Sequence, residues 1–83
     1  MVLSEMAQKV VENRQFVMFK YNKKNTSYDV KFDEGNKRGW TILDSWSASV
    51  YLTVWKKCNE GNQRKLDNMP IERALTVAFK LIN

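Results

Sequence analysis

The N-terminal segment of the chain carries apolar residues at helical spacing. After Ser4, apolar side chains return every three or four positions, and polar side chains fill the positions between them. This pattern predicts an amphipathic helix over residues 4–14, with Ser4 as its N-cap. The apolar stripe of this helix consists of Met6, Ala7, Val10 and Val11.

The spacing then changes to the alternation that is typical of β-strands. Residues 16–21 are rich in strand formers, and residues 28–33 alternate strictly between apolar and polar side chains. A polar Asn/Lys turn separates these two segments, which favours a hairpin. A second turn over residues 34–39 leads to residues 40–43, which return as a third strand. We therefore expect a three-stranded antiparallel meander.

Helical spacing resumes in the second half of the chain. Asp44 and the serine after it occupy cap positions before a helix that starts near Trp46 and stops at Gly61. Residues 63–66 predict one or two helical turns, and Pro70 suits the first position of a final helix. The apolar stripes of the two long helices place three further side chains in the core: Trp55, Cys58 and Phe79.

The order of these elements predicts the fold class. A helix, three strands and then two to three helices indicate an α+β fold with the helices packed on one face of the sheet. The chain has 83 residues and contains neither an internal repeat nor a linker, so residues 1–83 are expected to form one small domain.

The composition argues against catalysis. The chain has no histidine and a single cysteine, Cys58, which removes the usual zinc sites and the Cys/His and Ser/His nucleophile systems. Its three glycines fit neither the dinucleotide fingerprint nor the P-loop. We expect no catalytic residues, no metal and no cofactor. A lone cysteine and the lack of a long apolar run favour the reducing cytoplasm and exclude a membrane partner.

The net charge of +5 favours partners that are anionic, and the cations are clustered. One cluster surrounds the turn near Gly61, where four cations sharing one corner would hold a phosphate backbone, with Asn59, Asn62 and Gln63 adding hydrogen bonds. The other cations lie in the two turns of the meander, which are at opposite ends of the sheet. Solvated helix ends and solubilising turns are the alternative interpretation of both. The candidate cations are Lys56, Lys57, Arg64 and Lys65 at the first cluster and Lys23, Lys24, Lys37 and Arg38 at the turns.

Most of the ten aromatic residues are needed for the core of so small a domain. Trp46, at the start of its helix, and one of Phe16 or Tyr21 are expected to be exposed. An exposed aromatic side chain suggests a partner site. A helix-turn-helix reader in the C-terminal half is disfavoured, because the final helix offers few polar side chains to bases.

These observations predict a small non-catalytic binding protein that associates with nucleic acid through phosphate contacts. The alternative is a stoichiometric inhibitor or adaptor that docks on a larger nucleic-acid-handling protein, such as an anti-CRISPR protein acting on a host defence nuclease. A third interpretation is a homo-oligomer that pairs through strand edges or exposed aromatics. In its general character, short, rich in Lys and Asn and without catalytic groups, the chain resembles the small accessory proteins of bacteriophages and mobile elements.

Overall fold

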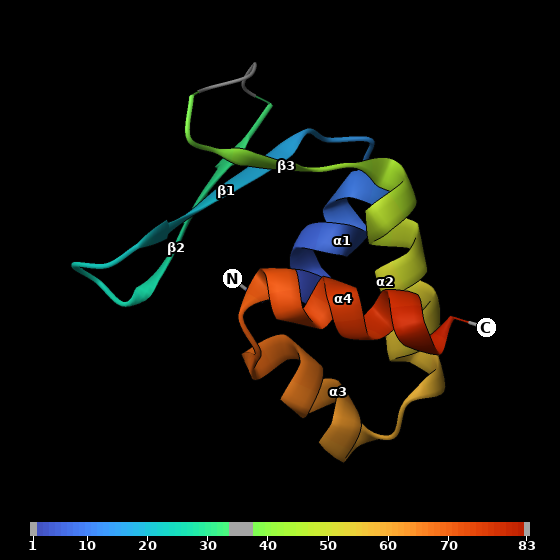
Figure 1. Ribbon diagram of the computed structural model, residues 1–83. Coiled ribbons are helices and arrows are strands. Elements are labelled where there is room, and N and C mark those ends of the chain that lie inside the picture. The colour runs from blue at the N-terminus through green and yellow to red at the C-terminus, as the bar shows by residue number, and fades with distance from the viewer. Residues whose placement is uncertain (1, 34–37, 83) are drawn as a thin grey trace.

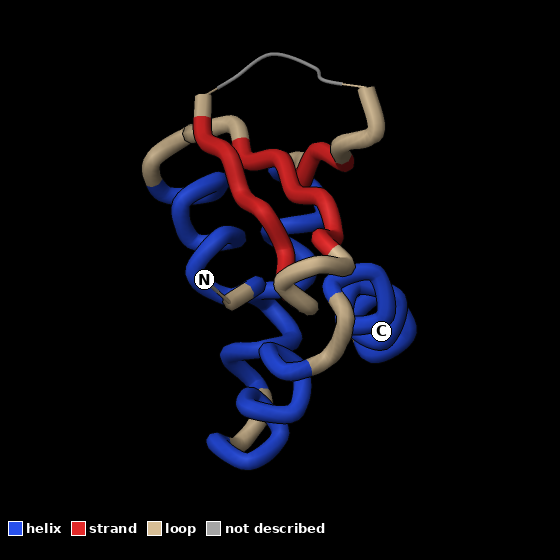
Figure 2. Tube along the Cα trace, turned by 90° about the vertical axis from the view of Figure 1, so that its left-hand side faces the viewer, coloured by secondary structure: helices blue, strands red, loops and turns tan. Residues whose placement is uncertain are grey.

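The computed structural model describes residues 2–33 and 38–82. Within them the chain forms an N-terminal helix, a three-stranded antiparallel sheet and three further helices, which confirms the α+β prediction (Figure 1). The elements are α1 (Leu3–Glu12), β1 (Val17–Asn22), β2 (Ser27–Phe32), β3 (Thr41–Leu43), α2 (Ser45–Lys57), α3 (Glu60–Asn68) and α4 (Ile71–Leu81). Figure 2 shows the strands as one layer with the helices beneath it.

The order of the strands differs from the expected meander. β1 lies in the centre, so that Val17 faces Phe32 of β2 on one side and Leu43 of β3 on the other. The reason lies in burial: β1 begins with three consecutive buried residues, whereas β2 is only half-buried and suits an edge. The connection between β2 and β3, residues 33–40, is also longer than a tight hairpin turn, so the chain can pass from β2 to the far side of β1.

The core lies between the sheet and the helices. Val17 and Phe19 point from β1 toward the helices, where α2 packs against both α1 and α4. Met18 is just as buried, although strand alternation places it on the opposite face. Its cross-strand partners are Lys31 and Ile42. The Lys31 ammonium lies 5.2 Å from the ring centroid of Trp40, so a small second cluster covers the outer face.

Tyr28 fastens the edge strand β2 to the start of α4. Its hydroxyl donates to a Glu72 carboxylate oxygen at 2.9 Å and accepts the Ile71 backbone N–H at 3.1 Å. Its ring meets those of Phe19 and Tyr21 edge to face. These hydrogen bonds add a polar link to the apolar contacts that hold the hairpin against the helical layer. Burial and then the hydrogen bond to Glu72 raise the pKa of Tyr28 above its usual value.

Several helix boundaries differ from the sequence-based expectation. α1 begins at Leu3 with Val2 as its N-cap, so Ser4 is not the cap. The Ser4 hydroxyl instead donates a hydrogen bond to the Asp67 carboxylate on α3. The cap of α2 is confirmed, since Asp44 accepts the Ser47 N–H at 2.7 Å. Gly61 does not end a helix, because α2 stops at Lys57 and Asn59 caps a new helix before that glycine. Residues 60–68 consequently form a full helix rather than one or two turns.

Candidate binding surfaces

The four cations near Gly61 surround the α2–α3 connection. Lys56 and Lys57 lie in the last turn of α2, and Arg64 and Lys65 lie on α3. All four are exposed, and none makes a salt bridge within the described part of the chain. At 1.5 Å of rise per residue, Arg64 lies only about 6 Å along α3 from its start. We call these four residues the basic corner.

The inner face of α3 orients the basic corner. Leu66 is buried, and the Gln63 side-chain amide donates to the Trp55 carbonyl at 2.9 Å. Because these residues face α2, the intervening positions Arg64 and Lys65 point to solvent. Asn59 and Gln63, which we expected to support a bound phosphate, are instead engaged within the fold. Asn59 accepts the Asn62 N–H as the cap of α3.

The cations of the strand turns do not join the basic corner into one patch. Lys23 and Lys24 are exposed in the β1–β2 turn, where the Lys24 N–H donates to the Asn22 side chain at 2.9 Å. Arg38 is exposed beyond the opposite end of β2. Lys37 lies outside the described residues. The described turn cations therefore occupy two ends of the sheet, as expected from the sequence.

Trp46 is exposed, as its position at the start of α2 suggests. Its side chain remains 69% accessible and stacks on Phe79 of α4, with ring centroids 5.2 Å apart and planes at 21°. The prediction that Phe79 belongs to the core is wrong: it is half-buried and lies outside the core cluster. The Phe79 ring lies beside Trp46 instead. Both Phe16 and Tyr21 are exposed, where we expected only one of them.

A carboxylate on α3 that the sequence did not single out joins three helices. Asp67 accepts four hydrogen bonds, and no pattern in the sequence relates its donors, because they lie 12 to 63 residues away. The Tyr51 hydroxyl, which is fully buried, is one of these donors. The four bonds come from the Ser4 N–H (3.1 Å), the Ser4 hydroxyl (2.8 Å), the Tyr51 hydroxyl (2.8 Å) and the Trp55 indole N–H (3.2 Å).

The ionisation of Tyr51 should leave a signature at high pH. Burial, followed by the hydrogen bond to Asp67, raises the pKa of Tyr51 far above its usual value near 10. The folded state thus favours the protonated phenol, so this contribution to stability is complete below about pH 10 and is lost as the pH rises further. Urea unfolding between about pH 9 and pH 11 should show a steeper loss of unfolding free energy in the parent than in Tyr51→Phe. Equal slopes would contradict the buried contact.

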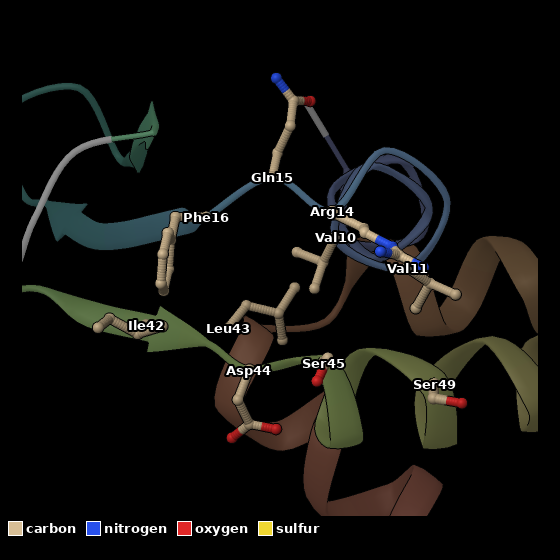
Figure 3. A pocket seen from close by; sticks show the side chains of 10 residues that line it. All are labelled: Val10, Val11, Arg14, Gln15, Phe16, Ile42, Leu43, Asp44, Ser45 and Ser49. Atoms are coloured by element: carbon tan, nitrogen blue, oxygen red, sulfur yellow. The ribbon is translucent and has the colours of Figure 1, made fainter.

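A hollow opens where the chain leaves the sheet for the helices. In the chain, α1 comes directly before β1, and α2 comes directly after β3. A space of about 640 Å³ lies between the α1–β1 connection and the β3–α2 connection. Figure 3 shows Phe16 and Ile42 toward one end, Val11 and Arg14 toward the other, and Val10 and Leu43 between them. The hollow is shaped by tertiary structure, and the sequence did not predict it.

No group of three or more Cys, Asp or Glu side chains among the described residues is placed to hold a metal ion. Within residues 2–33 and 38–82, no helix is both long and apolar enough to cross a membrane. No protein-family model, curated protein or solved structure matches this chain significantly.

Proposed function

We propose that this protein is a non-catalytic binding protein that associates with nucleic acid through phosphate contacts. The observation that carries the proposal is the basic corner: four exposed cations, free of salt bridges in the described structure, on two consecutive helices around one short connection. Unpaired cations lose no internal partner when a phosphate binds, and each contact releases condensed counterions. The single unpaired Cys58 is compatible with a reducing cytoplasm, which we propose as its setting.

The corner is suited to phosphate rather than to base edges. Lysine and arginine on an exposed helix end bind the backbone irrespective of sequence. Two of the three neutral side chains expected to add hydrogen bonds, Asn59 and Gln63, already bond within the fold. Affinity should consequently depend strongly on salt and only weakly on nucleotide sequence.

Neutralising the basic corner should abolish this binding. Changing Lys56, Lys57, Arg64 and Lys65 together to glutamine keeps good helix formers at exposed positions, so the fold should persist. The slope of log K against log salt should fall by about 3 to 4, since each duplex phosphate contact contributes about 0.9. Fluorescence anisotropy with duplex and single-stranded oligonucleotides, DNA and RNA, at several salt concentrations measures both quantities.

A second variant separates the corner from net charge. In this variant, four exposed cations that lie outside the basic corner are changed to glutamine, which removes the same charge. They are Lys23, Lys24, Arg73 and Lys80. This variant should keep most of the parent's affinity and its salt slope. Equal loss in both variants would show that net charge alone drives binding. Loss only in the second variant would place the contacts at the β1–β2 turn or on α4.

The second candidate function is docking on a larger protein as an inhibitor or adaptor. The stacked pair of Trp46 and Phe79 favours it, because exposed aromatic side chains often anchor protein interfaces. In the same assays Trp46→Ala should leave oligonucleotide binding intact. If the chain instead forms a salt-resistant complex with a nucleic-acid-handling protein, and Trp46→Ala disrupts it, the docking function is favoured. Size exclusion over a range of concentrations tests homo-oligomerisation.

A further inference from the structure

The hollow between α1 and α2 is lined by apolar and polar side chains in equal number, and the apolar ones are four aliphatic residues and Phe16. Val10 and Leu43 are buried at its base, whereas Phe16 remains 63% exposed and Val11 is also exposed. A volume of about 640 Å³ lies within the range of about 300–1,000 Å³ that is typical of ligand sites. The hollow has room for one or two apolar side chains of a partner.

Arg14 is the one cation among the described residues of this lining, and it occupies an unfavourable backbone conformation. Its φ is +55°, in the left-handed region where glycine costs least. The turn itself needs only backbone groups: the N–H groups of Asn13 and Gln15 both donate to the Lys9 carbonyl, at 3.1 and 3.3 Å. Glycine would serve this turn better, so the turn does not explain why an arginine is present.

The charges at the hollow favour an anionic group beside Arg14. The guanidinium makes no salt bridge with any described carboxylate. Asp44 is the one acid that the described residues contribute to the lining, and it is engaged as the cap of α2 through its bond to Ser47. A carboxylate from outside would therefore find an unpaired cation at the Arg14 end of the hollow (Figure 3).

We propose that this hollow binds a short acidic and apolar segment of a partner protein. An apolar side chain enters between Phe16 and Val10, and a neighbouring Asp or Glu of the segment pairs with Arg14. A nucleic acid suits the site less well, because single-strand binders combine several stacking aromatics with several cations. Among its described residues the hollow offers one aromatic and one cation. The proposal uses none of the basic corner, so it stands or falls independently of nucleic-acid binding.

An NMR titration tests this site. The probe is the peptide acetyl-Glu-Leu-Phe-Glu-amide, added to the ¹⁵N-labelled full chain. The backbone amides of Val11, Phe16 and Ser45 should shift, with a Kd of about 1 mM for so short a ligand. Arg14→Gln should weaken binding about fivefold, as expected for a partly exposed ion pair. Arg38→Gln removes the same charge from an exposed arginine outside the hollow and should leave the Kd unchanged.

Arg14→Gly separates binding from folding. Relief of the left-handed strain should raise the melting temperature by roughly 4 °C, while peptide binding weakens as in Arg14→Gln. The analogue acetyl-Gln-Leu-Phe-Gln-amide should bind more weakly than the acidic peptide. The proposal is overturned if the two peptides bind equally, if Arg14→Gln binds like the parent, or if no amide of the hollow shifts at 5 mM peptide, a concentration about five times the expected Kd. Stronger shifts of the same amides by oligo(dT) would overturn it in favour of nucleic acid.

Discussion

Replacing Asp67 by alanine is expected to lower the free energy of unfolding by about 3–5 kcal/mol. The carboxylate accepts four hydrogen bonds, and its loss leaves the donors on α1 and α2 without an acceptor. Two of them, the hydroxyls of Tyr51 and Ser4, belong to buried residues, and each unsatisfied buried donor costs about 1–3 kcal/mol. A small domain has only about 5 kcal/mol or slightly more in total, so the variant should be largely unfolded.

Urea denaturation at neutral pH measures this effect. Asp44→Ala is the matched control, because it removes an acid that accepts one hydrogen bond as a helix cap. That change should cost only about 1 kcal/mol. A loss of less than about 1 kcal/mol in Asp67→Ala would mean that water replaces the carboxylate at little cost. Asp67 would then not be what joins the three helices.

Phe19→Ala is expected to cost about 3–5 kcal/mol, because it empties the centre of the core. Phe19 is 1% exposed and lies on β1 between Val30 of β2 and Thr41 of β3. Tyr21, two positions further on the same face of β1, is 48% exposed. Tyr21→Ala should therefore cost far less. Thermal or urea unfolding of both variants measures the difference.

A pair of identical substitutions tests the strand order itself. In the observed sheet Val17 belongs to the central strand and is fully buried, whereas Val30 belongs to an edge strand and is half-buried. Val17→Ala should therefore be the more destabilising of the two, although both remove the same atoms. In a meander β2 would be central, and the larger cost would fall on Val30→Ala. That result would refute the order β2-β1-β3.

Local features of the sequence were enough to predict most of the elements. Strict alternation over residues 28–33 and helical spacing after Trp46 depend only on the geometry of a single strand or helix. The Asp44 cap depends on a side chain and a backbone N–H three residues apart. The exposure of Trp46 followed from its place at a helix start. Such short-range relations are visible in the chain itself, and the structure confirms each of them.

The candidate site was predicted in part. The exposure of the basic corner followed from four cations at polar positions. The length of α3, the helix that presents two of them, was underestimated, because only one or two turns were expected. The glycine at position 61 suggests the end of a helix when propensity alone is considered. The buried Leu66 and the four hydrogen bonds to Asp67 outweigh that preference, and they involve residues of α1 and α2.

The sequence by itself thus determined the order and type of the elements, because hydrophobic spacing and capping act over a few residues. Only the tertiary structure decided that β1 is central, that Asp67 links α1, α2 and α3, that Phe79 leaves the core to stack on Trp46, and that Arg14 stands beside an open hollow. Each of these four features depends on contacts between elements that lie far apart in the sequence. Those contacts reflect the total burial and hydrogen bonding of the whole domain, which no local pattern in the sequence records.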